Sequence, residues 1–369
     1  MTYESVDHLQ KVLAEKVFHY TKDAKKAAGR ALGTLVEIIT FYVLKSWGFE
    51  HSVAIETALP EYGNPEITHN VEYSLHAKLR KQRIKLVGAS PISSKRILDE
   101  VDERGISVAG FDRSGNVLLT SNAVLRNSCV VASGPRSNLV ATLDSLVRAK
   151  RYAIFECKRV GVEEGMKKGP QTIEKAKQGA YVAKSVSSLQ KVRTPSGELH
   201  GLIYKSTGLM YSKAYLELLT EVIASDDREL LRDFILTVGV VSNHGNWFTS
   251  DDHNKELKVL AQSYDWLIFL TDQGLAQFIT QLLLRPEPML IPAREAFLAS
   301  YSADKKKNKF TKVQMGYEAD QVLQTYFRKN RTVIEGWFNV IAPDRGTMPE
   351  LRSQLSRLRG KGWRAVHEL

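Results

Sequence analysis

Apolar positions recur at helical spacing through residues 3–47, with a break near Thr21. The pattern predicts two helices, the second capped by Thr21 at its start and ended by Gly48. The second helix, GRALGTLVEIITFYVLKSWGF, is apolar on nearly every side, so we expect it to be buried. Glu37 is the only acid in its middle. Its carboxylate either reaches water or a structural arginine, or it serves a functional site.

Farther along the chain, short apolar runs predict strands. The first are SVAIETAL and NVEYSLHA, followed by two runs around residues 112–115, whose composition favours a hairpin turn. SNLVATLDSLV and YAIFECKRV predict two strands joined by a tight basic turn, with a polar helix over Gln171 to Leu189 after them. The apolar runs HGLIYKS, ILTVGVVS and YDWLIFLT are separated by helical sequence, which predicts buried, parallel central strands.

These elements together predict an α/β or α+β protein with a mixed central β-sheet flanked by helices. From about Ile291 onward the chain is mostly helical and polar. We therefore expect a core over residues 1–290 and a basic, mostly helical C-terminal region over residues 291–369. That region either stands apart from the core or forms part of one domain.

Composition excludes several classes of protein. The 369 residues are 43 % hydrophobic and 25 % charged, unlike a wholly disordered, collagenous or transmembrane chain. The two cysteines, Cys129 and Cys157, form no CxxC pair, which argues against a disulfide framework and a thiolate zinc site. The N-terminus lacks the apolar core of a signal peptide, and residues 35–44 are too few to span a bilayer. We expect a soluble, cytoplasmic protein without membrane contact.

The chain is basic, with 52 Lys and Arg residues against 41 Asp and Glu residues and a formal net charge of +11. Such a surplus favours nucleic acid or an acidic membrane surface as a partner, although many basic proteins bind neither. Residues 301–369 hold 14 Lys and Arg residues against 7 Asp and Glu residues, so most of the surplus lies there. This region is either a solvated helical surface or a basic arm that contacts phosphates.

Two carboxylates and a lysine fall around the strand–turn–strand segment LDSLVRAKRYAIFECK. If its two strands pair, Asp144 returns close to Glu156, and Lys158 points the same way as Glu156 because side chains alternate along a strand. Two carboxylates and a backbone carbonyl suit Mg²⁺, and a nearby lysine can hold or deprotonate an attacking water. The alternative is a structural ion pair, because Glu156 after an apolar run is costly unless it is paired or bound to metal.

The residues Asp144, Glu156, Cys157 and Lys158, with the helix–strand order around them, resemble the PD-(D/E)xK nuclease superfamily, and within it the type II restriction endonucleases. The resemblance implies a restriction-endonuclease-like core with one or two Mg²⁺ ions per active site. It implies that Asp144, Glu156 and the backbone carbonyl of Cys157 bind the metal, and that Lys158 positions the water. Proline often precedes the first acid in this family, whereas Leu143 stands there in this chain.

The same resemblance gives roles to two further residues. Members commonly carry a glutamate on an N-terminal helix that reaches the metal site, so Glu37 is a candidate ligand for a second metal or its water. Gln178 and Tyr181 are three residues apart, whereas some members have a glutamine and a tyrosine four apart. Gln178 is therefore either an auxiliary residue of the site or an ordinary surface glutamine.

Candidate DNA contacts lie on both sides of this segment. Lys167 and Lys168 would form a basic edge near the cleft, or else a solvated surface. Asn243, His244 and Asn246 follow the strand ILTVGVV, at the kind of strand end where α/β proteins often place ligand contacts. They would contact a base or a backbone phosphate, or form an ordinary polar loop.

The leading hypothesis from the sequence is a Mg²⁺-dependent, sequence-specific endonuclease that hydrolyses phosphodiester bonds of double-stranded DNA, as a type II restriction enzyme does. A homodimer is expected, because a palindromic site matches a two-fold symmetric protein. The chain has no P-loop, so no nucleotide cofactor is expected. A repair, recombination or structure-specific nuclease of the same fold, and a non-catalytic DNA-binding module, remain the alternatives.

Overall fold

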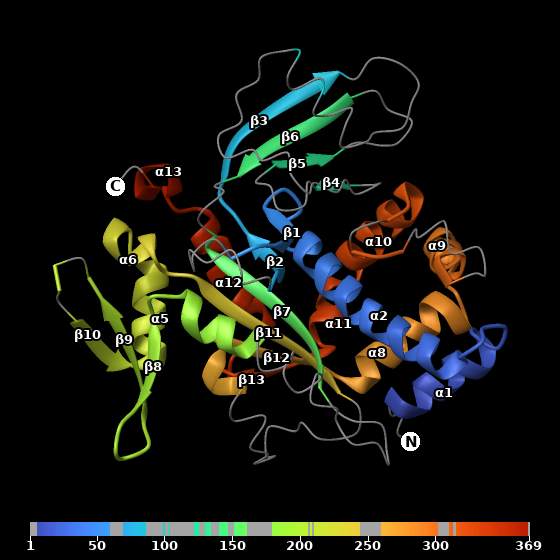
Figure 1. Ribbon diagram of the computed structural model, residues 1–369, viewed down its shortest axis with the longest axis horizontal. Helices are drawn as coiled ribbons and strands as arrows, with labels where there is room; N and C mark the ends of the chain where they lie inside the picture. The colour runs from blue at the N-terminus through green and yellow to red at the C-terminus, as the bar shows by residue number, and fades with distance from the viewer. Residues whose placement is uncertain are drawn as a thin grey trace.

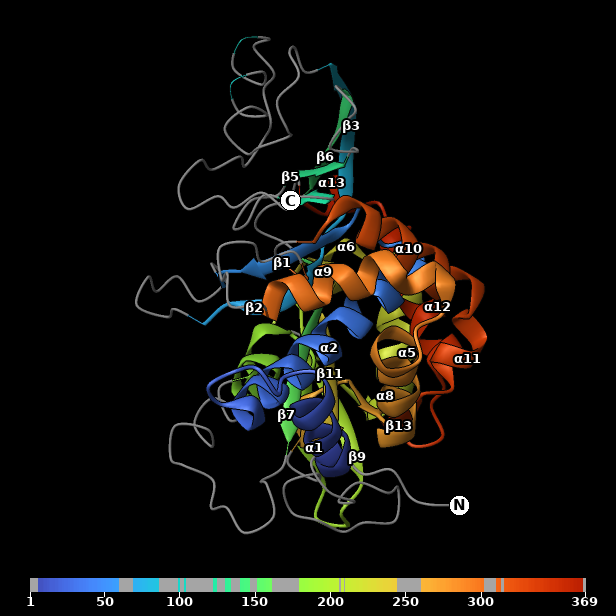
Figure 2. The same cartoon turned by 90° about the vertical axis from the view of Figure 1, so that its right-hand side faces the viewer.

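A computed structural model describes most of the chain, shown in two views in Figures 1 and 2. The described residues are 6–59, 69–85, 99, 103, 122–124, 130–133, 140–146, 151–160, 179–205, 207–208, 210–243, 260–301, 310–312 and 315–367. For several strand residues, among them Asp144 and Lys158, only the backbone is described.

The largest sheet has six strands in the order β1-β2-β7-β11-β12-β13. Their bounds are β1 Val53–Thr57, β2 Val71–Leu75, β7 Ala153–Val160, β11 Leu236–Asn243, β12 Trp266–Leu270 and β13 Phe338–Ala342. Strands β7, β11 and β12 run parallel, and the other neighbours are antiparallel. The mixed sheet flanked by helices confirms the predicted fold class. The predictions of parallel central strands at ILTVGVVS and YDWLIFLT are also confirmed.

The two faces of this sheet are covered by different elements. Phe155, Val238 and Ile268 belong to the main hydrophobic core, together with the buried side of helix α2. The alternate residues Ile154 and Val241 instead pack with residues 180–183, within the described helical stretch 179–186. The alternation follows from the two-residue period of a strand and explains why the central strands are apolar on both sides.

Most helices of the described part lie on the α2 side of the sheet (Figure 2). The helix bounds are α1 Val6–Lys16, α2 Ala24–Ser46, α5 Tyr215–Ala224, α6 Arg228–Arg232, α8 Asp272–Ile279, α9 Ile291–Tyr301, α10 Tyr317–Lys329, α11 Arg331–Glu335, α12 Met348–Arg359 and α13 Trp363–His367. A π-helical turn at Thr280–Leu284 and a 3-10 turn at Pro288–Leu290 join α8 to α9.

Helix α2 is the longest helix of the described residues and crosses the core. Its N-cap is Asp23, whose carboxylate accepts a hydrogen bond from the backbone N–H of Lys26 at 2.9 Å. The prediction that Thr21 caps this helix is wrong, because the Thr21 hydroxyl donates to the carbonyl of Phe18 in the preceding turn. The predicted end at Gly48 is confirmed, and its φ of 85° is one that glycine adopts without strain.

Among the described helices, α2 alone is long and apolar enough to cross a membrane by length and composition. Of its most apolar window, 67 % is buried inside the protein. That burial is typical of the core helix of a soluble protein and agrees with the sequence-based prediction that the helix is buried.

Two smaller antiparallel sheets accompany the central one. The four-stranded sheet, ordered β3-β6-β5-β4, lies at the top of Figure 1 and consists of β3 Lys78–Lys85, β6 Val140–Leu146, β5 Val130–Ser133 and β4 Asn122–Val124. The three-stranded sheet consists of β8 Gln190–Arg193, β9 Leu199–Tyr204 and β10 Met210–Ala214. The prediction that HGLIYKS is a parallel central strand is therefore wrong, because β9 pairs antiparallel with β8 and β10.

The C-terminal region forms part of the core. Strand β13 pairs with β12 at the edge of the central sheet, and α10 packs against α2. Asp320 of α10 is fully buried and accepts a hydrogen bond from the hydroxyl of Tyr42 at 2.8 Å. These contacts favour the second of the two expected arrangements, in which residues 291–369 form part of one domain. The predicted division at residue 290 itself stays a prediction.

Candidate active site

Three glutamates stand at one level of the central sheet, on three adjacent strands. Tyr73 of β2 pairs with Phe155 of β7, so the next residues along these two strands are Glu72 and Glu156. Glu56 of β1 lies opposite Glu72 in the continuous register of β1 with β2. An acid on each of three neighbouring strands concentrates negative charge, which is unfavourable unless cations balance it.

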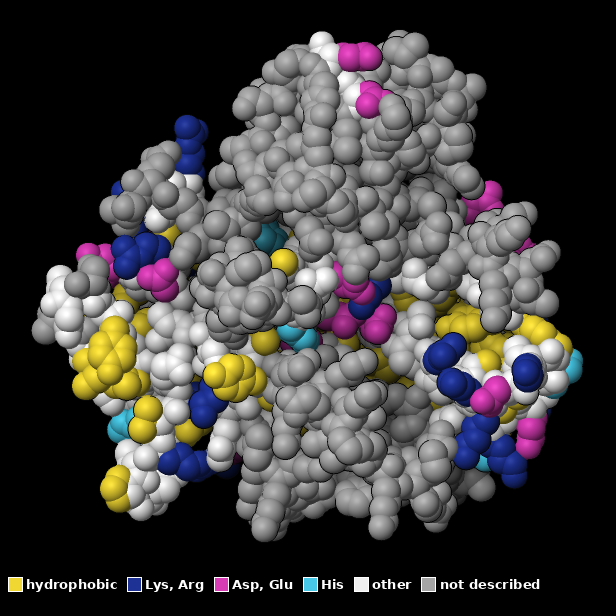
Figure 3. Space-filling model, viewed as in Figure 1, with side chains coloured by type: hydrophobic (Ala, Val, Ile, Leu, Met, Phe, Trp, Pro, Cys, Tyr) yellow, Lys and Arg dark blue, Asp and Glu magenta, His cyan; other side chains and the backbone are white. Residues whose placement is uncertain are grey.

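One lysine ammonium group contacts two of these carboxylates and a third from helix α2. The Nζ of Lys312 lies 3.1 Å from Glu56 Oε1 and 3.4 Å from Glu37 Oε2, and it contacts Glu72 Oε1 directly. We call these four residues the Lys312 cluster. The side chains of Lys312 and Glu72 are only 10 % and 12 % exposed, whereas Glu56 and Glu37 are 25 % and 31 % exposed. In Figure 3, acidic side chains gather near the centre of this face, beside a basic one.

Tyr73 holds helix α2 against β2 and so positions Glu37. Its hydroxyl donates a hydrogen bond to the backbone carbonyl of Glu37 at 2.8 Å, and its ring stacks on Phe41 with centroids 5.6 Å apart. Burial, reinforced by the charges of Cys157, Glu37 and Glu56, raises the pKa of Tyr73 well above its usual value. The hydroxyl therefore stays protonated and keeps donating at neutral pH.

Glu56 has an unusual backbone conformation for a strand residue. Its φ is 48°, in the left-handed region that side chains other than glycine adopt at a cost of about 1–2 kcal/mol. Backbone outliers of this kind persist when the surrounding structure enforces them, and they concentrate at functional sites. The strain at Glu56 thus coincides with the convergence of carboxylates on Lys312.

Glu156 is almost completely buried, with 1 % exposure. Its Oε1 lies 3.1 Å from Nε2 of His69, a residue just before β2. Gly239 is the register partner of Glu156 on β11, and a Cβ at Gly239 would lie 2.7 Å from the ring of Tyr264. Only glycine allows Tyr264 to cover the sheet there. Burial, with a smaller contribution from the charges of Glu156 and Cys157, raises the pKa of Tyr264 well above its usual value.

The structure does not bring Asp144 back beside Glu156 through a hairpin. Strand β6, which contains Asp144, pairs with β3 and β5 in the four-stranded sheet, where Asp144 is the register partner of Lys81. Strand β7, which contains Glu156, pairs with β2 and β11 in the central sheet. The predicted pairing of these two strands is therefore wrong. The basic sequence between the two strands is compatible with a hairpin turn, but each strand pairs with other strands.

The other predicted residues fall in three groups. Glu37 lies in the Lys312 cluster, and Cys157, next to Glu156 on β7, is half-buried against the main core. Lys158 and Asn243 lie on β7 and β11 as predicted, with only their backbones described. The remaining candidates lie outside the described residues: Lys167, Lys168, Gln178, His244 and Asn246. The metal-binding and DNA-binding roles of all these residues stay predictions.

The sequence-based reasoning missed Glu72, Glu56 and Lys312. Glu72 interrupts the apolar strand NVEYSL as Glu156 interrupts YAIFECK, so a buried acid on a strand was a signal available for both. Glu56 offered a weaker version of this signal in VAIET. Lys312 lies in a polar basic stretch, and nothing in its local sequence distinguishes it from a solvated lysine.

Among the described residues, no three metal-ligating side chains lie close enough together to bind an ion without rearrangement. The donor set nevertheless suits a hard cation, because carboxylate oxygens are the ligands that Mg²⁺ prefers. A cation already lies among these oxygens, in the form of the Lys312 ammonium group. The residues present therefore fit a divalent metal, provided that the lysine gives way.

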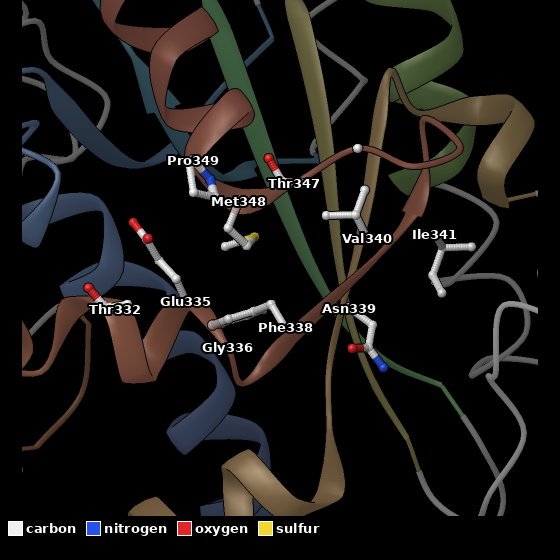
Figure 4. Close-up of a pocket in the computed structure, with 11 residues that line it drawn as sticks. Thr332, Glu335, Gly336, Phe338, Asn339, Val340, Ile341, Thr347, Met348 and Pro349 are labelled. Atoms are coloured by element: carbon white, nitrogen blue, oxygen red, sulfur yellow. The ribbon is translucent and has the colours of Figure 1, made fainter.

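A pocket elsewhere in the described part has a different lining, with Glu335 as its ionisable residue. It has a volume of about 570 Å³ and lies between the end of α11, strand β13 and the start of α12 (Figure 4). The Oε1 of Glu335 accepts hydrogen bonds from Trp47 Nε1 and Arg352 Nη1, each at 2.8 Å. The carboxylate is thus engaged in holding α11 to α2 and α12.

Comparisons with protein-family models, with curated protein sequences and with solved structures give no match to this chain.

Proposed function

We propose that this protein is a Mg²⁺-dependent endonuclease that hydrolyses phosphodiester bonds of double-stranded DNA. The observation that carries the proposal is the position of Glu72 and Glu156 on adjacent, paired strands, one residue beyond the Tyr73–Phe155 pair. The sequence-based hypothesis places the first acid on a strand that pairs antiparallel with the strand of Glu156. Strand β2 pairs with β7 in this way and contains Glu72, so Glu72 replaces Asp144 in the proposed site.

Each residue of the proposed site has a distinct task. Glu72 and Glu156 would bind the metal, which when bound supplies a lowered pKa for a coordinated water and charge stabilisation for the phosphate. Glu37, on α2, would bind a second ion or orient a water. Lys158 follows Glu156 by one strand repeat, and it would hold the attacking water in line with the scissile bond. His69 at 3.1 Å keeps the Glu156 carboxylate oriented.

The net charge of +11 supports a polyanionic substrate. A cluster of carboxylates repels DNA, so substrate binding must rely on basic residues outside the cluster and on the bound metal. We further propose the type II restriction enzyme as the specific form, with a homodimer reading a palindromic site in the cytoplasm. This finer proposal rests on the sequence resemblance alone.

The decisive experiment incubates long duplex DNA, linear and circular, with the full chain in Mg²⁺ or in EDTA. Discrete fragments that form only with Mg²⁺ are the expected result. Cleavage confined to DNA ends or junctions would contradict the restriction enzyme and indicate a repair or structure-specific nuclease. DNA binding without cleavage in any divalent metal would contradict the enzyme and leave a binding module.

A matched set of variants tests the assignment of the residues. Glu72→Gln should reduce the cleavage rate by about 100-fold or more, because it removes a charged metal ligand but keeps the side-chain shape. Asp144→Asn, the control, should stay within about threefold of wild type because its strand belongs to another sheet. The opposite ranking of the two variants would restore the site predicted from the sequence.

A further inference from the structure

We propose that Lys312 is a tethered cation that competes with the divalent metal for Glu37, Glu56 and Glu72, and so sets the metal affinity of the site. The inference rests on the proposed function, because it assumes that these carboxylates belong to a metal-dependent active site. It assigns a role to a residue for which the sequence offered no signal.

The geometry places the ammonium group against carboxylate oxygens that the proposed metal would also use, among them those of Glu72 and Glu37. Lys312 Nζ contacts carboxylate oxygens of three residues that come from a helix and two strands. The side chain is 10 % exposed, so it reaches these oxygens from inside the protein rather than from the solvent. A lysine on a flexible surface would not be held at that depth.

The segment around Lys312 is anchored independently of the carboxylates. Phe310 and Met315 form an antiparallel bridge, and both side chains are buried, at 0 % and 3 % exposure. The ring of Phe310 packs edge-on against Phe297 of α9, with centroids 5.2 Å apart. The buried side chains of Phe310 and Met315 thus fix the chain close to Lys312, so its ammonium group stays near the three carboxylates.

The ammonium group and a divalent ion cannot share these oxygens. The carboxylate oxygens that contact the ammonium group are also the hard donors that a dication prefers. A protonated amine has no lone pair and cannot become a ligand, and at ligand distances it repels the metal. Metal binding therefore requires the Lys312 ammonium group to leave the carboxylates. The free energy needed to break its ion pairs weakens the binding of the metal by the same amount.

The test measures metal binding directly, with the full chain and without DNA. Calorimetric titration with Ca²⁺ and with Mn²⁺ compares wild type with Lys312→Met, which keeps the length and apolar stem but removes the charge. The dissociation constant of Lys312→Met should be lower by about tenfold or more, whereas Lys312→Arg should stay close to wild type. Lys361→Met is the matched control, because the partner of Lys361, Asp226, is an exposed carboxylate away from the cluster.

Equal or weaker metal binding by Lys312→Met would overturn the inference. The variant loses the cation that three carboxylates contact, so its thermal unfolding is followed with and without Ca²⁺. A larger stabilisation by Ca²⁺ in the variant than in wild type supports competition, and an equal or smaller one contradicts it. If the wild type cleaves DNA but Lys312→Met gains no affinity, only this inference fails. If neither protein binds a divalent ion and no DNA is cleaved, the proposed function fails as well.

Discussion

Lys45 and Lys312 are both buried lysines that contact carboxylates, and they differ in how those carboxylates are arranged around the ammonium group. Lys45 Nζ lies 2.5 Å from Asp320 Oδ1, and both side chains are at most 1 % exposed. The same residue, Asp320, accepts hydrogen bonds from Tyr42 and Gln324, so its carboxylate is well hydrogen-bonded. Lys312 instead faces three acids, with a fourth on the next strand.

The difference separates a structural ion pair from a candidate site. The Lys45–Asp320 pair lies deep in the core, is hydrogen-bonded and holds α10 against α2. The Lys312 cluster instead brings carboxylates from a helix and two strands around one ammonium group, and in our proposal these carboxylates belong to a metal site. The number of carboxylates that contact a buried lysine is thus more informative about its role than the burial of the lysine alone.

The largest effect should follow from breaking the ion pair between Lys45 and Asp320. Asp320→Asn leaves the buried ammonium group of Lys45 without its counter-charge, and we expect a loss of about 3–5 kcal/mol in the free energy of unfolding. Urea denaturation followed by circular dichroism measures this loss. Metal affinity should not change in the folded fraction.

The control for this prediction is an ion pair of similar length whose carboxylate is exposed. Asp226 is 89 % exposed and lies 2.9 Å from Lys361. Asp226→Asn should change the free energy of unfolding by no more than about 0.5 kcal/mol. Equal losses in Asp226→Asn and Asp320→Asn would show that burial does not distinguish the two pairs.

Lys191 extends the comparison to a buried lysine held chiefly by backbone carbonyls. Its Nζ donates to the carbonyls of Ala261 and Tyr264 and lies 4.5 Å from the ring centroid of Tyr215. Burial, partly offset by the charge of Asp265, lowers its pKa from 10.5 to about 8. Lys45, with its own carboxylate, also has a lowered pKa because burial outweighs the attraction of Asp320.

The lowered pKa of Lys191 predicts a pH dependence of stability. Above pH 8 the folded state releases the proton while the unfolded state keeps it up to pH 10.5, so unfolding takes up a proton in this window. The free energy of unfolding should therefore rise with pH, by up to about 1.4 kcal/mol per pH unit between about pH 8 and 9.5. Above about pH 10 the buried tyrosines, with raised pKa values, act in the opposite direction.

Denaturation at several pH values in this window tests the assignment. Lys191→Met should flatten the rise, and Lys213→Met, which removes an exposed lysine paired with Glu221, should keep it. An unchanged slope in Lys191→Met would mean that another group causes the pH dependence.

The central strands could be predicted from the sequence, but the strands that pair with them could not. Apolar runs predicted β7, β11 and β12, because burial on both faces leaves a local signature. The partner of Asp144 could not be predicted in this way, since pairing is decided by contacts between segments far apart in the chain. The basic turn before Arg151 suited a hairpin locally, but the central sheet paired β7 with β2, whose sequence lies some 80 residues earlier.

The candidate site shows the same limit. Glu156 and Glu37 were found because each is an isolated acid in an apolar element, and burial of an acid is costly without a partner. Lys312 was missed because it becomes buried only when its side chain meets α2 and strands β1 and β2 in the tertiary fold. Local sequence can identify a residue that needs a counter-charge, whereas the identity of that counter-charge depends on the tertiary fold.

The smallest effect should come from relieving the strain at Glu56, and it tests whether the Lys312 cluster maintains that strain. Glu56→Gly removes the left-handed strain, and one carboxylate, so we expect the free energy of unfolding to rise by about 1 kcal/mol. Arg345→Gly relieves a similar φ of 59° in the turn before α12 without touching the cluster, and Glu56→Gln removes the charge but keeps the strain. Urea denaturation of the three variants separates the two contributions. A gain in Arg345→Gly alone would mean that the ion pair of Glu56 with Lys312 outweighs its strain, and that the cluster holds this backbone in place.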